Sequence, residues 1–172
     1  MSRKMMFALV VLTVMVTASV QAEGPATPPA VTKLLGLVGS WHGTAQMTDA
    51  GKSPVKVDVD IQCRQVSGGA GVACDTHMAW PGTDYLETDL FGWNAEAGQV
   101  HWYTVTNGGE VHDHVGTFEG NKLVVRYTGS SSGRLLTEDV ALDSGSNAMS
   151  FDVLAKVGGD VASTMTGKVT RR

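Results

Sequence analysis

Hydrophobic and polar residues alternate along most of the chain that follows residue 40. The segment VKVDVDIQC shows the pattern most clearly, with Val55, Val57, Val59, Ile61 and Cys63 on one face and polar residues on the other. A period of two over this length predicts a β-strand with one buried face. The same pattern predicts nine further strands, at Trp41–Met47, Gly71–Ala79, Leu86–Trp93, Val100–Thr106, Val111–Phe118, Lys122–Thr128, Thr137–Leu142, Met149–Val157 and Val161–Thr170. The chain is therefore predicted to be all-β.

Short turns rich in glycine, asparagine and aspartate separate these strands. The sequences SGGAG, NGG, EGN, DSGSN and GGD are typical of hairpin loops. About ten strands joined in this way predict an antiparallel up-and-down β-barrel or a β-sandwich. We favour the barrel because closure removes exposed strand edges, and a barrel of this size has room for a small ligand. The apolar segment VTKLLGLVG predicts a short helical turn before the first strand, and Ala79–Glu87 and Gly129–Gly133 are expected as loops at the barrel mouth.

The amino-terminal residues have the pattern of a cleavable secretory signal. Arg3 and Lys4 precede an apolar run from Met5 to Val20, and small residues at positions 20 and 22 suit cleavage after Ala22. The alternative, a membrane anchor, is disfavoured because the run is shorter than the roughly 20 residues that span a bilayer. We expect a signal peptide at residues 1–22, a Pro-rich leader at 23–32 and a barrel domain at 33–172. The mature protein would be periplasmic or secreted, without a membrane anchor.

The charge of the chain narrows the classes of molecule that it can bind. The formal net charge is −4 at pH 7 and no basic run is present, so nucleic acid and anionic membrane surfaces are poor partners.

The only two cysteines, Cys63 and Cys74, flank a Gly-rich turn. If Gly68 and Gly69 form a two-residue hairpin turn, the cysteines lie directly opposite each other, at a separation that a disulfide can bridge. We therefore predict a structural disulfide between Cys63 and Cys74.

The segment VGSWHGTA places Gly39, Trp41 and Gly43 at the opening of the first strand. This Gly-x-Trp-x-Gly pattern resembles the signature of lipocalins and the wider calycin group, in particular the nitrobindin-like branch. The stretch DLFGWNAEAGQVHWYTVTNGGEVHDHVGTFEGNKLVVRYTG and the ending GKVTRR also resemble a family of secreted bacterial proteins, described as a lipocalin-like domain of unknown function. The resemblance spans residues 34–172. It implies a calycin-like barrel with a ligand-sized interior, in which the Trp41 ring plugs the closed end beneath a late arginine such as Arg171.

The hairpin from Val100 to Phe118 carries three of the five histidines. A two-residue turn at Asn107-Gly108 or Gly108-Gly109 would put His101, Tyr103, His112 and His114 on one face of the sheet. The next hairpin would add Phe118, Leu123, Val125 and Tyr127 to that face, which we favour as the barrel interior. A three-residue turn at Asn107–Gly109 would instead put His101 on the opposite face.

These residues support three hypotheses for function. We favour binding of a small hydrophobic or amphipathic molecule in the barrel interior, with His101, Tyr103, His112, His114, Phe118 and Tyr127 as lining residues. The first alternative is a zinc-dependent enzyme whose metal is held by His101, His112 and His114, with one coordination position open. The second alternative is a structural or protein-interaction barrel.

Haem binding is not expected. The resemblance to nitrobindins implies an axial histidine late in the chain, and no histidine follows His114 here. No other cofactor is expected from the sequence.

Overall fold

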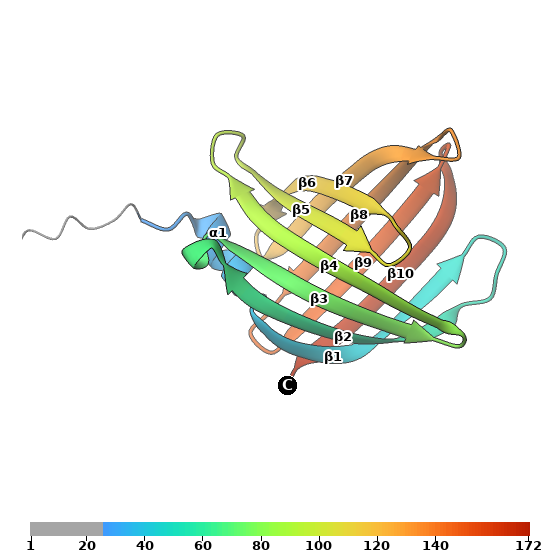
Figure 1. The fold of residues 1–172 in the computed structure, drawn as a ribbon, viewed down its shortest axis with the longest axis horizontal. Helices are drawn as coiled ribbons and strands as arrows, with labels where there is room; N and C mark the ends of the chain where they lie inside the picture. Colours follow the sequence, from blue (N-terminus) through green and yellow to red (C-terminus); the bar gives the residue numbers. More distant parts are fainter. Residues whose placement is uncertain (1–25) are drawn as a thin grey trace, which may run out of the picture.

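The computed structural model describes residues 26–172, which form a closed β-barrel with a short helix at its amino-terminal side (Figure 1). Consecutive strands pair in antiparallel fashion around the barrel, and β1 closes it by pairing with β10. The strands are β1 (Gly39–Asp49), β2 (Val55–Val66), β3 (Gly71–Trp80), β4 (Thr83–Asn94), β5 (Gln99–Thr106), β6 (Val111–Glu119), β7 (Lys122–Ser131), β8 (Arg134–Ser144), β9 (Ala148–Val157) and β10 (Asp160–Arg171). The prediction of an all-β up-and-down barrel of about ten strands is confirmed.

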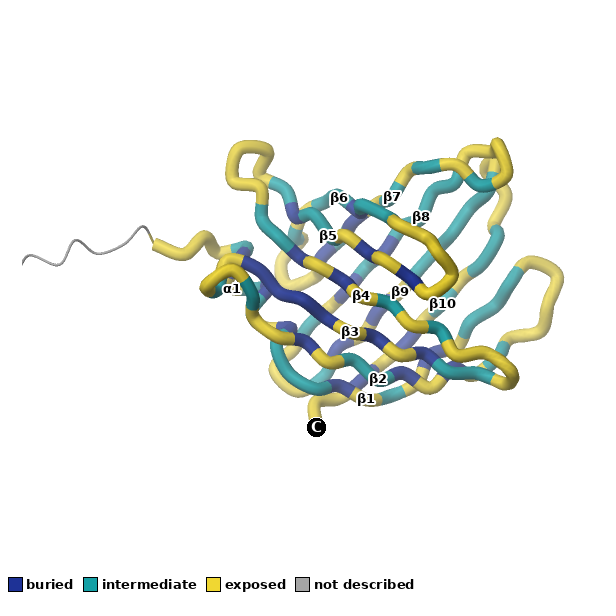
Figure 2. Tube along the Cα trace, in the orientation of Figure 1, coloured by how far each residue is buried: buried dark blue, intermediate teal, exposed yellow. Residues whose placement is uncertain are grey.

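Side chains alternate between the barrel interior and the outer surface, as a period of two requires. In β2, Val57, Val59 and Cys63 are buried, whereas Lys56 and Asp58 are exposed. Figure 2 shows the same alternation as buried and exposed stretches that follow one another along the strands. The apolar positions recognised in the sequence therefore form the core inside the barrel.

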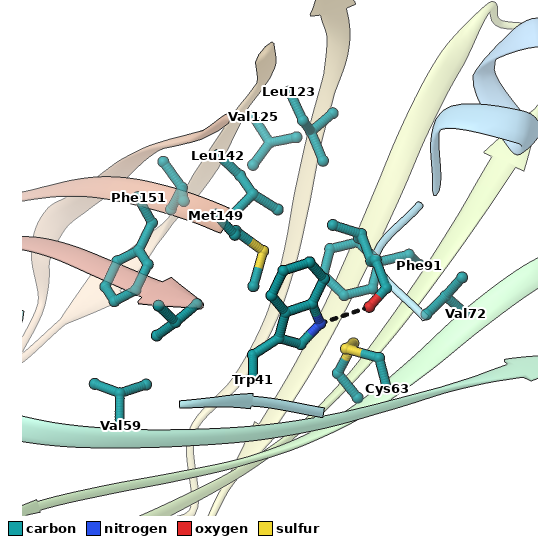
Figure 3. Packing of buried hydrophobic residues seen from close by; sticks show 14 of the residues in the cluster. Trp41, Val59, Cys63, Val72, Phe91, Leu123, Val125, Leu142, Met149 and Phe151 are labelled. Atoms are coloured by element: carbon teal, nitrogen blue, oxygen red, sulfur yellow. Dashed lines mark hydrogen bonds between the residues drawn. A yellow bond between two sulfur atoms is a disulfide. The ribbon is translucent and has the colours of Figure 1, made fainter. Parts of the chain in front are cut away.

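Trp41 closes one end of this barrel. Its ring is fully buried, and its indole nitrogen donates a hydrogen bond to the Leu37 carbonyl oxygen at 2.8 Å (Figure 3). The guanidinium carbon of Arg171 lies 4.2 Å from the centre of the Trp41 ring. Arg171 also donates hydrogen bonds to the carbonyl oxygens of Val38 and Gly36. The structure thus contains the tryptophan plug and the covering arginine that the resemblance implied.

The two glycines of the signature allow close approach of neighbouring groups near the closed end. A side chain at Gly43 would collide with the backbone of β10 at Lys168. Gly39 has a φ of +141°, and a side chain there would meet the guanidinium group of Arg171. Glycine has no Cβ, so it suits both positions. The Gly-x-Trp-x-Gly pattern therefore has a steric basis in this barrel.

Helix α1 (Pro29–Leu35) packs beside the closed end and buries Val31 and Leu34. It begins inside the segment expected to be an extended leader, because proline is tolerated in the first turn of a helix, where its missing N–H has no partner to lose. The expected signal peptide at residues 1–22 lies outside the described residues. Within residues 26–172, no helix has the length and apolar character needed to cross a membrane.

The predicted disulfide between Cys63 and Cys74 is present and joins β2 to β3. The two cysteines pair directly across the ladder, with their Cα atoms 4.0 Å apart. The connecting loop occupies residues 67–70 and is longer than the expected two-residue turn. Because the loop extends by one residue on each side of Gly68-Gly69, the cross-strand partners stay the same. Both cysteines are buried in the core.

The two expected mouth loops are shorter than predicted. Strand β3 runs to Trp80 and β4 begins at Thr83, so the connection is the tight turn at residues 81–82. Strand β7 likewise runs to Ser131, leaving only residues 132–133 before β8. Both turns lie at the end of the barrel opposite Trp41, together with the β1–β2 connection (Figure 1). We refer to this end as the open end.

Candidate functional site

The β5–β6 hairpin decides which histidines face the interior. Trp102 pairs with His114, and Thr104 pairs with His112. The backbone N–H of Thr106 donates to the Glu110 carbonyl oxygen at 3.0 Å, which closes a three-residue loop at residues 107–109. An odd number of loop residues puts the even-numbered residues of both strands on one face. Of the two turns considered, the structure therefore has the three-residue one at residues 107–109.

As a result, His101 and Tyr103 lie on the outer surface of the barrel. The Nδ1 atom of His101 is 3.1 Å from Oδ1 of Asp113 on the neighbouring strand. Its ring stacks on Tyr103 with centroids 5.8 Å apart, and Tyr103 is 46% exposed. The expected interior position of these two residues is wrong. The three-histidine set does not assemble, because the sheet separates His101 from His112 and His114.

His112 and His114 face the interior beside two residues from neighbouring strands, Tyr127 of β7 and Glu138 of β8. The Nδ1 atom of His112 is 3.2 Å from Oε2 of Glu138, and Nε2 of His114 is 3.4 Å from the same oxygen. The Tyr127 ring stacks on His112 with centroids 4.0 Å apart. Two imidazoles and one carboxylate therefore converge on one point of the inner wall.

His114 is buried without a hydrogen-bond partner. Its residue exposure is 3%, and neither ring nitrogen is hydrogen-bonded to any other group in the part of the chain that the structure describes. Trp102 and Tyr127 approach its ring, with centroid separations of 5.5 and 5.7 Å. An unsatisfied buried polar group costs about 1–3 kcal/mol. Such a group is a candidate for contact with a ligand.

Glu138 is the acidic member of this cluster. Burial raises the pKa of its carboxyl group, but the adjacent imidazoles of His114 and His112 outweigh burial and lower the pKa below its usual value. The carboxyl group is therefore ionised at neutral pH. It places a negative charge between the two histidines.

A second acidic pair, Glu87 and Asp89, faces the interior from β4. Asp89 accepts hydrogen bonds from Nε1 of Trp102 at 2.6 Å and from Oγ1 of Thr104 at 2.7 Å. Burial, followed by the charge of Asp89, raises the pKa of Glu87 well above its usual value. Burial also raises the pKa of Asp89, although the two hydrogen bonds oppose that shift. These carboxyl groups therefore keep protons to higher pH than exposed ones do.

The polar residues described above line a cavity of about 310 Å³ inside the barrel. Strands β4, β5, β6 and β8 supply these residues, and we call this surface the polar wall; its members are Glu87, Asp89, Trp102, Thr104, His112, His114 and Glu138. Toward Trp41 the lining is apolar and includes Phe91, Leu142, Met149 and Phe151. The cavity therefore combines an apolar interior with one polar side, as small-molecule sites commonly do.

The other predicted lining residues occupy different positions. Phe118 lies near the closed end, where Nζ of Lys33 approaches the centre of its ring at 5.2 Å. Tyr127 contacts His112 and His114 instead of forming part of the cavity lining. The roles of His112, His114, Phe118 and Tyr127 in ligand binding stay predictions.

Three acidic residues of the polar wall were not recognised in the sequence. Glu138 alternates with the apolar residues Leu136 and Val140 along β8. Glu87 and Asp89 occupy the same face of β4 as Tyr85 and Phe91. An acidic residue at an apolar position of a period-two pattern indicates a buried carboxyl group, because such residues are seldom buried without a partner. This signal identifies Glu138, whereas on β4 the opposite face carries Leu86 and Leu90, so the pattern alone does not show that Glu87 and Asp89 are inside.

No protein-family model matches the chain, and no curated protein matches it in sequence. Its fold is similar to that of Rv2717c from M. tuberculosis, with a TM-score of 0.67 and 15% identity, over 86% of this chain and 99% of that one. It is also similar to the S-type phycobiliprotein lyase CPES from Guillardia theta, with a TM-score of 0.51 and 10% identity, over 81% of this chain and 89% of that one. At these identities the similarity shows the fold alone, a calycin-like ten-strand barrel. Membership of the secreted bacterial family stays a prediction.

Proposed function

We propose that this protein binds a small amphipathic molecule inside its barrel. The observation that carries the proposal is the cavity of about 310 Å³, with an apolar end near Trp41 and a polar wall on β4–β8. This volume falls at the lower end of the roughly 300–1,000 Å³ found for small-molecule sites.

The charge of the cavity lining limits the ligands that fit. Four acidic residues line it, namely Glu87, Asp89, Glu110 and Glu138. Among residues 26–172, no lysine or arginine contributes to the lining. An anionic head group would therefore meet these acidic groups, Glu138 ionised among them, without a lysine or arginine to pair with it, which is unfavourable. We infer that the polar part of the ligand is neutral or cationic.

The proposal is tested with the neutral fluorescent probe N-phenyl-1-naphthylamine, followed by competition with octylamine and octanoate. These competitors share an eight-carbon chain and differ in the charge of the head group. We expect the probe to bind, and octylamine to displace it at a concentration at least about tenfold lower than octanoate, because like charges repel at the polar wall. Absence of probe binding would contradict interior binding. Equal displacement by the two competitors would contradict only the inference about charge.

A matched pair of variants locates the bound probe. Ala155→Trp adds a large side chain inside the cavity, whereas Lys156→Trp adds the same side chain at the next position, on the opposite face of β9. We expect Ala155→Trp to abolish probe binding and Lys156→Trp to leave it unchanged. Loss of binding in both variants would indicate that the probe binds to the outer surface or that folding is impaired, which circular dichroism would distinguish.

We also propose that the protein works outside the cytoplasm. The Cys63–Cys74 disulfide supports this location, because structural disulfides persist mainly in oxidising compartments. Thiol labelling of fractionated cells tests it. Recovery of the chain with two free thiols from the cytoplasmic fraction would contradict the proposal.

A further inference from the structure

We propose that His112, His114 and Glu138 form a binding site for a divalent transition-metal ion such as zinc. One ligand atom from each residue faces a common point, and the three atoms lie within 4.8 Å of one another. The site does not depend on the small-molecule function, because the metal ion itself is the ligand. It differs from the site expected from the sequence, since Glu138 occupies the place given to His101.

The separations between the Glu138 oxygen and the two histidine nitrogens fit tetrahedral coordination. Zinc binds imidazole nitrogen and carboxylate oxygen at about 2.0–2.2 Å, so neighbouring ligands of a tetrahedral site lie about 3.3–3.5 Å apart. The Glu138 oxygen is 3.2 Å from the His112 nitrogen and 3.4 Å from the His114 nitrogen. Both distances match those of a tetrahedral site, and the two imidazole nitrogens lie within 4.8 Å of each other, so a shift of the histidine rings would complete the coordination.

His114 supplies independent support for a ligand at this point. The residue is 3% exposed, and its Nε2 atom is directed toward Glu138 without forming a hydrogen bond. Metal coordination would satisfy this nitrogen and offset the cost of its burial. The stacked ring of Tyr127 restricts the rotation of His112, so two of the ligands are held in place before an ion arrives.

The ligand set indicates the class of metal. Two imidazole nitrogens favour zinc, copper, iron or nickel, whereas calcium and magnesium prefer oxygen ligands. The ionised Glu138 supplies one negative charge to a divalent ion. The His112 side chain is 13% exposed and the Glu138 side chain is 22% exposed, and both line the cavity, so an ion can enter from it. Three protein ligands leave one coordination position that faces the cavity.

The test uses the full chain without an affinity tag, stripped with a chelator and titrated with zinc by isothermal calorimetry. Glu138→Gln and His114→Gln remove one ligand each and keep the approximate shape of the side chain. His101→Ala is the matched control, because it removes a histidine from the same hairpin but on the outer surface. Cobalt(II) absorption provides a second readout, since tetrahedral cobalt has intense visible bands.

We expect one zinc ion per chain and a tetrahedral cobalt spectrum. We expect affinity to fall at least about tenfold in Glu138→Gln and His114→Gln, and to stay unchanged in His101→Ala. Absence of zinc binding, or equal affinity in wild type and Glu138→Gln, would overturn the proposal. Loss of binding in His101→Ala would also overturn it, by placing the ion on the outer surface beside Asp113.

Discussion

The closed end of the barrel and its polar wall differ in how completely their polar groups are hydrogen-bonded: Asp89 on the polar wall is hydrogen-bonded, but His114 is not. At the closed end, the indole nitrogen of Trp41 is hydrogen-bonded and Arg171 donates to backbone carbonyl oxygens. On the polar wall, His114 is buried without a partner and Glu87 is held with a raised pKa. Satisfied polar groups stabilise a fold, whereas unsatisfied ones cost stability. We conclude that the closed end maintains the barrel and that the polar wall is shaped for binding.

The largest difference in the free energy of unfolding is expected between alanine substitutions of the tryptophans at the two ends of the barrel. Trp41→Ala should lower the free energy of unfolding by about 3–5 kcal/mol, because it empties a fully buried site and removes a hydrogen bond. Trp80→Ala, at the open end of β3, should cost only about 1 kcal/mol because Trp80 is partly exposed. Chemical denaturation measures both values. Equal losses in the free energy of unfolding would contradict the inference that the closed end contributes more to stability than the open end.

A smaller effect of opposite sign is expected on the polar wall. His114→Leu combined with Glu138→Leu should raise the free energy of unfolding by about 1 kcal/mol, because the pair of substitutions removes the buried imidazole whose nitrogens lack hydrogen bonds together with the buried carboxylate beside it. The same pair of substitutions should abolish zinc binding. His101→Leu, on the outer surface, should change stability by less than about 0.5 kcal/mol. A loss of stability in the metal-free double variant would show that the His114–Glu138 contact stabilises the fold by more than its burial costs.

The smallest effect concerns the pH dependence of stability. Because the pKa of Glu87 is raised in the folded state, that state binds more protons than the unfolded chain once the pH exceeds the ordinary value of 4.5. The free energy of unfolding should therefore fall as the pH rises from that value through the folded pKa. Glu87→Gln should make this decline shallower. Denaturation midpoints across this pH range measure it.

The control for this prediction is Glu119→Gln, which neutralises an exposed carboxyl group at the end of β6. It should leave the decline as steep as in the wild type. An unchanged pH dependence in Glu87→Gln would show that the Glu87 carboxyl group titrates alike in the folded and unfolded states.

Two hairpins show how far the sequence determines cross-strand pairing. For β2–β3 we predicted a two-residue turn, and the four-residue loop found there leaves Cys63 opposite Cys74. For β5–β6 we considered two-residue and three-residue turns, and the three-residue loop found there places His101 on the outer surface. One additional loop residue moves the side chains of one strand to the opposite face of the sheet relative to its partner. Two additional residues leave them on the same face. A strand pattern is therefore predicted more reliably than the face that a given residue occupies.

The candidate site was predicted only in part for the same reason. His112 and His114 lie two residues apart on one strand, so their shared face follows from the sequence. Glu138 joins them from β8, on the far side of β7, and its proximity depends on the pairing of three strands. Its position among apolar residues indicated burial but not which residues it would contact.

The sequence by itself determined the strands, their hairpin connections and the disulfide, whereas the tryptophan plug was implied by the resemblance to calycins. These features depend on a period of two, on glycine at crowded positions and on contacts within single hairpins. Only the tertiary structure decided that His101 is outside, that Glu138 completes the histidine pair and that the interior contains a cavity. The number of loop residues decides which side chains of two paired strands share a face. Barrel closure brings together strands that are distant in sequence. Neither effect is encoded in the periodicity of one strand.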